Sequence, residues 1–256
     1  MWRIAMLLVA ACGRLGFEPV VGGITDDTTM LPPSDARSAS GLVYANSPRE
    51  LYRIDPMTRA VTSVGAFNGP CAAEPMTDIA IDQSGVLIGV TFDNVYRIDA
   101  ETAACELLAP LPRDFNGLSF VPSGDEDILV GTTVMGELYQ IDAATGMSNR
   151  IARYGGGVQS AGDLVAVRGV GTFAAVRRMS DTTDHLARVD VATGTTTVIG
   201  DTGFFDVFGL GYWNGSVYGF TNSRKFVLID LTTGAGTLVE QGTVTWWGAG
   251  VTTNAE

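Results

Sequence analysis

Oxygen-bearing side chains stand at or near the starts of several short apolar runs, namely at Asp78, Asn116, Asp163 and Asp206. A hard cation such as calcium takes six to eight oxygen ligands, so a ring of these four residues could hold one. Aromatic residues stand beside them at Phe115, Phe205 and Trp247, and aromatic faces next to carboxylates also suit sugar rings. The other interpretation is that these polar residues cap strand ends in water, because no known spacing motif supports a site.

Other residue types point to little chemistry. His185 is the only histidine, and we expect it to be a solvated residue of the loop that starts at Met179. A zinc site would need a second histidine or suitably spaced cysteines, and Cys71 and Cys105 are not spaced for one. The sequence contains no nucleophile elbow, phosphate loop or dinucleotide fingerprint. These absences favour a protein that is not an enzyme.

One short sequence recurs along the chain. The segment Leu51 to Asp55 returns in similar form, its closing aspartates spaced by 40 to 48 residues, as Val95 to Asp99, Leu138 to Asp142, Leu186 to Asp190 and Val227 to Asp230. The second to fifth repeats each contain four apolar runs bounded by Gly, Asp, Asn and Thr, and none of these runs has helical spacing. Four short strands at this period are typical of a β-propeller blade.

The closing aspartates have a structural explanation. Three are followed by a glycine four residues later, as in Asp142 to Gly146, Asp190 to Gly194 and Asp230 to Gly234. The carboxylate can accept a backbone N–H two residues on, and glycine supplies the positive φ of the turn. Arg59 and Ala103 replace this glycine in the first two repeats, so we expect different turns there.

The two ends of the repeat region complement each other. The first repeat has three strands and lacks the one that opens every other repeat, while Trp246 to Val251 follows the fifth repeat and resembles that missing strand. The sequence therefore predicts an all-β fold over residues 41–253: a five-bladed β-propeller of four-stranded antiparallel blades, closed when the C-terminal strand joins the first blade. Closure removes the exposed sheet edges that invite aggregation.

The repeats resemble a broad bacterial group of propellers with Tyr-x-Ile-Asp-x-x-Thr-Gly repeats. Tyr139 to Gly146 matches this pattern at every fixed position, with Gln140, Ala143 and Ala144 at its variable positions. The group includes lactonase-like, quinoprotein-like and cell-surface propellers. The resemblance covers residues 41–253 and implies a fold, but it implies no catalytic residue.

The N-terminal segment predicts export. Ile4 to Ala11 is an apolar run too short to span a bilayer, and it fits the core of a signal peptide. Leu8 to Cys12 resembles a bacterial lipobox, in which the cysteine is lipidated and becomes the new N-terminus. We therefore expect residues 1–12 to be a lipoprotein signal peptide with Cys12 as the lipidation site; a cleaved signal with an incidental cysteine is the alternative. Residues 13–40, rich in Gly, Pro and Ser, predict a flexible tether.

Composition limits the class of partner, and the two remaining cysteines bear on the redox state of the protein's compartment. Hydrophobic residues make up 46% of the 256 residues and the net charge is −12, which allows a large core and disfavours binding to nucleic acid. If the protein is exported, Cys71 and Cys105 can form a disulfide, and two buried free thiols are the alternative.

These observations favour a membrane-anchored lipoprotein of the bacterial cell envelope, at the outer membrane or the cell surface. Its lipid would be its contact with the membrane, and we expect a monomer whose propeller face binds a protein or glycan of the envelope without catalysis. The alternative is a metal-assisted hydrolase or lactonase, with calcium held at the channel mouth. A structural member of a surface assembly is the third hypothesis.

Overall fold

The computed structural model describes residues 43–255. The predicted signal peptide with Cys12 and the predicted tether lie outside the described residues. Within residues 43–255, no helix is long and apolar enough to cross a membrane.

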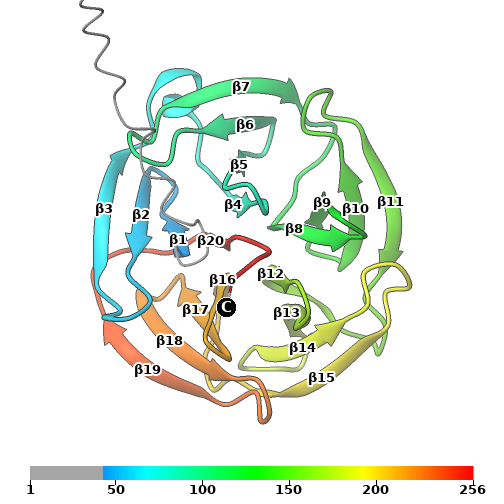
Figure 1. The fold of residues 1–256 in the computed structure, drawn as a ribbon. Helices are drawn as coiled ribbons and strands as arrows, with labels where there is room; N and C mark the ends of the chain where they lie inside the picture. The colour runs from blue at the N-terminus through cyan, green and yellow to red at the C-terminus, as the bar shows by residue number, and fades with distance from the viewer. Residues whose placement is uncertain (1–42, 256) are drawn as a thin grey trace, which may run out of the picture. The chain divides into compact units, whose positions relative to one another are not determined.

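The described residues form a ring of five four-stranded antiparallel sheets (Figure 1). This confirms the predicted all-β, five-bladed propeller. Blades 1 to 3, each from the inner to the outer strand, are β20 (Gly248–Val251), β1 (Val43–Asn46), β2 (Glu50–Ile54), β3 (Val61–Ala66); β4 (Asp78–Ile81), β5 (Leu87–Val90), β6 (Asn94–Ile98), β7 (Cys105–Pro110); and β8 (Gly117–Ser123), β9 (Glu126–Thr132), β10 (Glu137–Ile141), β11 (Ser148–Arg153). Blades 4 and 5 are β12 (Gln159–Val167), β13 (Gly171–Arg177), β14 (His185–Val189), β15 (Thr196–Asp201); and β16 (Val207–Trp213), β17 (Ser216–Thr221), β18 (Lys225–Asp230), β19 (Gly236–Gln241).

The C-terminal strand completes the first blade, as the sequence predicts. In Figure 1 the red β20 lies beside the blue β1, and their antiparallel register pairs Val43 with Val251 and Ala45 with Ala249. The segment after β20 also reaches other blades, because Thr253 Oγ1 donates to Asp127 Oδ2 at 2.6 Å. The ring is therefore closed by residues from opposite ends of the chain.

All five closing aspartates make the same turn. In the first, Asp55 Oδ1 accepts the N–H groups of Met57 at 2.8 Å and Thr58 at 2.9 Å. The fourth residue after the aspartate has a positive φ in every repeat, including 62° at Arg59 and 55° at Ala103. The prediction that these two turns differ is wrong. The hydrogen bonds of the four-residue loop hold its last residue in the left-handed backbone conformation. Where that residue is not glycine, this conformation destabilises the fold by about 1–2 kcal/mol.

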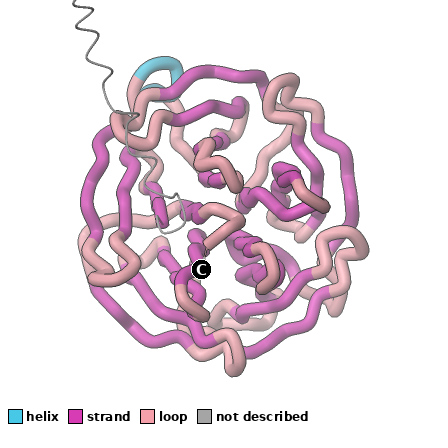
Figure 2. The backbone as a smooth tube through the Cα atoms, in the orientation of Figure 1, coloured by secondary structure: helices cyan, strands magenta, loops and turns pink. Residues whose placement is uncertain are grey.

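Neighbouring blades interlock at the rim of the ring. The outer strands run around this rim, and loops join them to the inner strands (Figures 1 and 2). The turn between the third and fourth strands of one blade consequently meets the end of the preceding blade's outer strand. A Cβ atom on Gly194 would lie 2.1 Å from Arg153 O, and one on Gly146 would lie 1.9 Å from Pro110 O. Glycine is therefore required here for contact as well as for φ.

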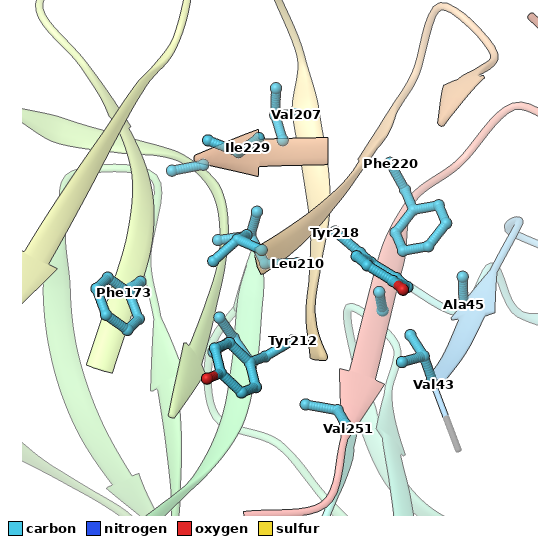
Figure 3. Close-up of a cluster of buried hydrophobic side chains, with 14 of the residues drawn as sticks. Val43, Ala45, Phe173, Val207, Leu210, Tyr212, Tyr218, Phe220, Ile229 and Val251 are labelled. Atoms are coloured by element: carbon cyan, nitrogen blue, oxygen red, sulfur yellow. The ribbon is translucent and has the colours of Figure 1, made fainter. Parts of the chain in front are cut away.

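Apolar side chains fill the spaces between blades. Figure 3 shows a buried cluster in which Phe173 of blade 4, Leu210 and Phe220 of blade 5, and Val43 and Val251 of blade 1 lie together. Each is at most 5% exposed. Because each blade buries both faces against its neighbours, inner strands are buried along their length and do not alternate in burial.

A disulfide joins Cys71 to Cys105, which settles the pairing that the sequence left open. Cys71 lies in a short 3-10 helix, η1 (Gly69–Ala73), in the connection between blades 1 and 2. Cys105 begins β7, the outer strand of blade 2. The bond thus fixes the junction at which Ala103 replaces the usual glycine.

Candidate ligand-binding site

One end of the ring carries a pocket of about 420 Å³, which we call the mouth pocket. It is lined by Thr77, Phe92, Phe115, Asn116, Val134, Gln159, Ser160, Ala161, Gly162, Arg177, Asp206, Phe208 and Trp247. These residues come from the starts of the inner strands and from the loops between second and third strands. The propeller places these two kinds of segment at one face, as expected from the repeat order, and the volume is typical of a small-ligand site.

The predicted aromatic residues occupy different places. Phe115 and Trp247 line the mouth pocket, and Trp247 makes an edge contact with Phe92 at 6.4 Å between ring centroids. Phe205 is not among the lining residues. Its ring instead lies under the guanidinium of Arg177, at 4.2 Å from Cζ to the ring centroid.

Arg177, which sequence reasoning missed, links three segments at the edge of the pocket. Its Nη2 donates to Ala161 O at 3.0 Å and to Asp206 Oδ1 at 3.1 Å. Its Nε lies 3.0 Å from Asp184 Oδ1. Only the fold reveals this role, because these partners lie on both sides of Arg177 in the sequence and no local motif connects them.

Asp184 is a buried partner of this arginine. Its side chain is fully buried, and its Oδ2 accepts the N–H of Val207 at 2.8 Å. Burial raises the pKa of Asp184 to about 6, and this effect outweighs the opposing effects of the Val207 N–H and of Arg177. The carboxyl therefore holds its proton at a higher pH than an exposed aspartate does.

Asp78 and Asp163 lie beneath the floor of the mouth pocket and are fully buried. The residues directly before them, Thr77 and Gly162, line the pocket. Asp78 Oδ2 accepts the N–H of Leu118 at 2.7 Å, and Asp163 Oδ1 lies 3.4 Å from the same nitrogen. The two carboxyl groups thus approach each other where inner strands of different blades converge.

Further backbone bonds hold this carboxyl pair. Asp78 Oδ1 accepts from Ile79 at 2.8 Å, while Asp163 accepts from Leu164 at 2.6 Å and from Leu210 at 2.7 Å. Burial and then the neighbouring Asp163 carboxyl raise the pKa of Asp78 well above its usual range. Burial raises the pKa of Asp163 in the same direction.

Asp163 lies in an irregular part of β12. The pairing of β12 with β13 is regular from Leu164 onward but shifts between Ser160 and Leu164. Such a bulge bends the strand locally. Periodicity in the sequence gives no sign of this irregularity.

The structure separates the four predicted oxygen ligands into two levels. Asn116 and Asp206 line the mouth pocket, and Asp78 and Asp163 lie below it. Asp206 already pairs with Arg177, whose positive charge disfavours a metal ion beside it. Within the part of the chain that the structure describes, no group of three or more His, Cys, Asp or Glu side chains could hold a metal. The four-residue calcium ring stays a prediction.

His185 is not a solvated loop residue. It is the first residue of β14, its side chain is only 20% exposed, and its Nδ1 lies 3.6 Å from Asp181 Oδ2. The expectation of a freely solvated loop histidine is therefore wrong, because pairing with β13 and β15 draws the residue into the sheet.

Large apolar side chains surround the pocket. Met179 is 93% exposed and Val134 63% exposed, and Met135, Phe92 and Phe205 are each about 45% exposed. All five lie in loops between second and third strands or in the connection between blades. Exposed apolar side chains that gather around a pocket, unlike scattered ones, mark a binding surface.

Comparison with known proteins supports the fold alone. No protein-family model matches the sequence, and no curated protein matches it. A crystal structure of a protein of unknown function from Bacteroides thetaiotaomicron is similar, with 11% identity and a TM-score of 0.52 over 80% of this chain and 56% of that chain. The computationally designed Ika8 protein is 14% identical, with a TM-score of 0.37 over 80% of this chain and 60% of that chain. The match thus spans little more than half of the first protein's length.

Proposed function

We propose that this protein is a non-catalytic binding module of the bacterial cell envelope, whose mouth pocket and surrounding apolar loops hold a protein or glycan partner. The observation that carries the proposal is the coincidence of a concave site with exposed apolar side chains on the same loops. Aromatic rings dominate the centre of such recognition surfaces, because they bury a large area at little entropic cost.

The polar residues of the pocket suit recognition of a neutral group. Asn116 makes only long contacts, from Nδ2 to Ser160 Oγ at 3.4 Å and from Thr132 Oγ1 to its Oδ1 at 3.5 Å. Its amide can therefore exchange these contacts for bonds to a ligand. Arg177 already pairs with both Asp206 and Asp184, so the pocket edge does not select an anionic partner.

The disulfide supports export. Disulfides form and persist in oxidising compartments, including the bacterial periplasm and the cell surface, and Cys71 and Cys105 are bonded. We propose that residues 1–12 direct export, that Cys12 carries the lipid, and that residues 13–40 tether the propeller. Membrane fractionation of Cys12→Ser tests this anchor: we expect the variant in the soluble envelope fraction, and unchanged membrane association would contradict lipidation.

Binding is tested with a matched pair of variants. Phe92→Ala with Trp247→Ala removes two apolar walls of the mouth pocket, whereas Leu107→Ala with Leu238→Ala removes exposed leucines of the outer strands β7 and β19. A glycan array and a pull-down from envelope extract are run with wild type and both variants. We expect a glycan or protein ligand that the pocket variant loses and the outer-strand variant retains. Equal binding by the two variants would contradict the proposal. The absence of a ligand in both assays would also contradict it and would favour a structural role in a surface assembly.

The alternative prediction, a calcium-assisted hydrolase or lactonase, differs in its readout. It requires turnover of a lactone or ester that depends on added calcium and on the four residues Asp78, Asn116, Asp163 and Asp206. No contact in the structure specifically favours this reaction.

A further inference from the structure

Two buried carboxyl groups beneath the mouth pocket lack a compensating positive charge. Among the residues that the structure describes, no Lys, Arg or His side chain lies within 4 Å of Asp78 or Asp163. Burying one unpaired carboxylate already costs several kcal/mol, and two side by side repel each other as well. Something positive must therefore accompany this pair if both are ionised.

Asn46 adds a third oxygen to the same place. Its side chain is fully buried, and its Nδ2 donates to Ser47 O and to Met76 O, both at 3.1 Å. These two carbonyl groups fix the orientation of the amide, because its oxygen could not replace the nitrogen opposite them. Asn46 Oδ1 is consequently held away from both carbonyls, and it has no hydrogen-bond partner.

The oxygens of Asn46 and Asp78 lie around a space that glycine leaves open. A Cβ atom on Gly248 would lie 2.1 Å from Asp78 Oδ1 and 2.7 Å from Asn46 Oδ1. Two buried acceptors thus face one small region. Asp78 Oδ1 accepts the Ile79 N–H, whereas Asn46 Oδ1 has no donor, although a buried acceptor normally has one. A bound cation would satisfy Asn46 Oδ1 and use the remaining lone pairs of Asp78.

We propose that a hard divalent cation of the calcium class binds on the propeller axis between Asp78, Asp163 and Asn46, directly beneath the mouth pocket. Carboxylate and amide oxygens are the ligands that such ions prefer, and two carboxylates balance a charge of +2. The backbone N–H bonds to the carboxylates leave each oxygen further lone pairs. Water can complete the coordination from the pocket side, where Thr77, Gly162 and Trp247 lie.

This site differs from the four-residue ring that the sequence suggests. It keeps Asp78 and Asp163, replaces Asn116 and Asp206 by Asn46, and is independent of the ligand proposed for the mouth pocket. Asn46 was missed because it ends a second strand, β1, whereas the sequence pattern drew attention to the starts of inner strands.

The competing explanation is a proton held by the carboxyl pair. It would relieve the same repulsion, and the buried Tyr154 hydroxyl near Asp163 is the other titratable group on this side. The two explanations give opposite results when the pH rises. A proton leaves, so the free energy of unfolding falls, whereas a cation binds more tightly because protons no longer compete.

The test uses the full chain treated with EDTA and then dialysed. Thermal melting is recorded with calcium, with magnesium and with EDTA across the range from acidic to neutral pH, and bound metal is measured by elemental analysis. Asp163→Asn and Asn46→Ala remove ligands, and Asp206→Asn is the control because Asp206 lines the pocket without belonging to the site. We expect about one bound ion, a calcium-dependent rise in the melting temperature that grows with pH, and at least about tenfold weaker calcium binding in the two ligand variants.

Asn46→Asp keeps the test decisive if the ligand variants fail to fold. It adds a third carboxylate at the same place, so it should bind calcium more tightly than wild type and melt at a lower temperature than wild type in EDTA. The proposal is overturned if wild type holds no metal, calcium leaves every melting temperature unchanged, and the stability of wild type falls with rising pH more steeply than that of Asp163→Asn, which keeps the titration of Asp184. That combination would assign the carboxyl pair to a proton.

Discussion

Arg177 and Asp184 show how burial and pairing compete at single residues. Asp184 is in contact with a guanidinium, a neighbour that normally lowers the pKa of a carboxyl. Its burial is nonetheless the larger effect and raises its pKa to about 6. The consequence is a dependence of stability on pH with a definite sign.

Between pH 4 and 6, Asp184 should make the protein less stable as the pH rises. The native state keeps a proton that the unfolded chain, with an ordinary pKa of 3.8, has released, so the free energy of unfolding falls over this window and levels off above it. The change is about 3 kcal/mol for a shift of this size. Asp184→Asn removes this titration. Between pH 4 and 6, urea unfolding should therefore show the free energy of unfolding of the variant rising relative to that of wild type by about 3 kcal/mol. A constant difference between the two would show that Arg177 fully compensates for burial.

Glycine serves two physical purposes in the turns of the propeller, and one pair of variants separates them. Gly124, in the hairpin between β8 and β9, and Gly194, in a rim turn, both have positive φ, 63° and 73°, but a Cβ atom has nothing within 4 Å at Gly124 and meets Arg153 O at Gly194. Gly124→Ala should therefore cost about 1–2 kcal/mol through the left-handed backbone alone. Gly194→Ala should cost about 3 kcal/mol or more, because the methyl group also forces two blades apart. Chemical denaturation measures both, and equal losses would mean that the junction yields freely.

At the scale of elements, the junctions between blades decide how rigid the ring is. Each junction combines packed inner strands with a rim turn against the preceding blade, and Figure 1 shows the five junctions in sequence around the ring. The junction between blades 1 and 2 has one covalent addition, because Cys71 in η1 is bonded to Cys105 in β7. Asn68, just before η1, also bridges to Ala104.

Removing this disulfide should destabilise the propeller without abolishing it. The two cysteines are separated by 34 residues, and closing a loop of that length stabilises the folded state by about 4 kcal/mol through the unfolded chain. Cys71→Ser with Cys105→Ser should lower the free energy of unfolding by up to this amount, and wild type in reductant should behave alike. Denaturation with and without reductant measures the effect. A stability unaffected by reductant would show that the bond does not restrict the unfolded chain.

At the scale of the whole molecule, closure by the C-terminal segment is the decisive contact. β20 pairs with β1, and Ile81 bridges to Thr252 beyond it. Thr253 O accepts from the N–H of Arg168 in blade 4 at 2.7 Å, and Thr253 Oγ1 donates to Asp127 in blade 3, so the same segment reaches blades 1 to 4. Without it, one edge of β1 and the apolar faces around it would be exposed.

A chain ending at residue 245 should therefore lack cooperative unfolding and should aggregate through the open edge of β1. Adding a synthetic peptide of residues 244–256 should restore a cooperative melt, because it supplies the missing inner strand in trans. Calorimetry and size-exclusion chromatography check both expectations. A shortened chain that melts as sharply as wild type would show that the ring does not depend on closure.

Sequence patterns alone predict the repeat, the number of blades, the aspartate turns and the segment that completes blade 1. Each depends on local patterns, such as apolar runs bounded by turn residues and an aspartate that accepts the next backbone N–H groups. Arg59 and Ala103 are exceptions among these local predictions, because the hydrogen-bonded loop imposes a positive φ that their residue types do not predict.

Which polar atoms meet depends on the three-dimensional fold. Asp78 and Asp163 approach each other because inner strands from different blades converge. Asn46 and Arg177 contact residues distant in sequence, which no repeat period predicts. Strands and turns depend on residues that are close in the sequence, whereas contacts between side chains of different blades depend on the twist and closure of the whole ring.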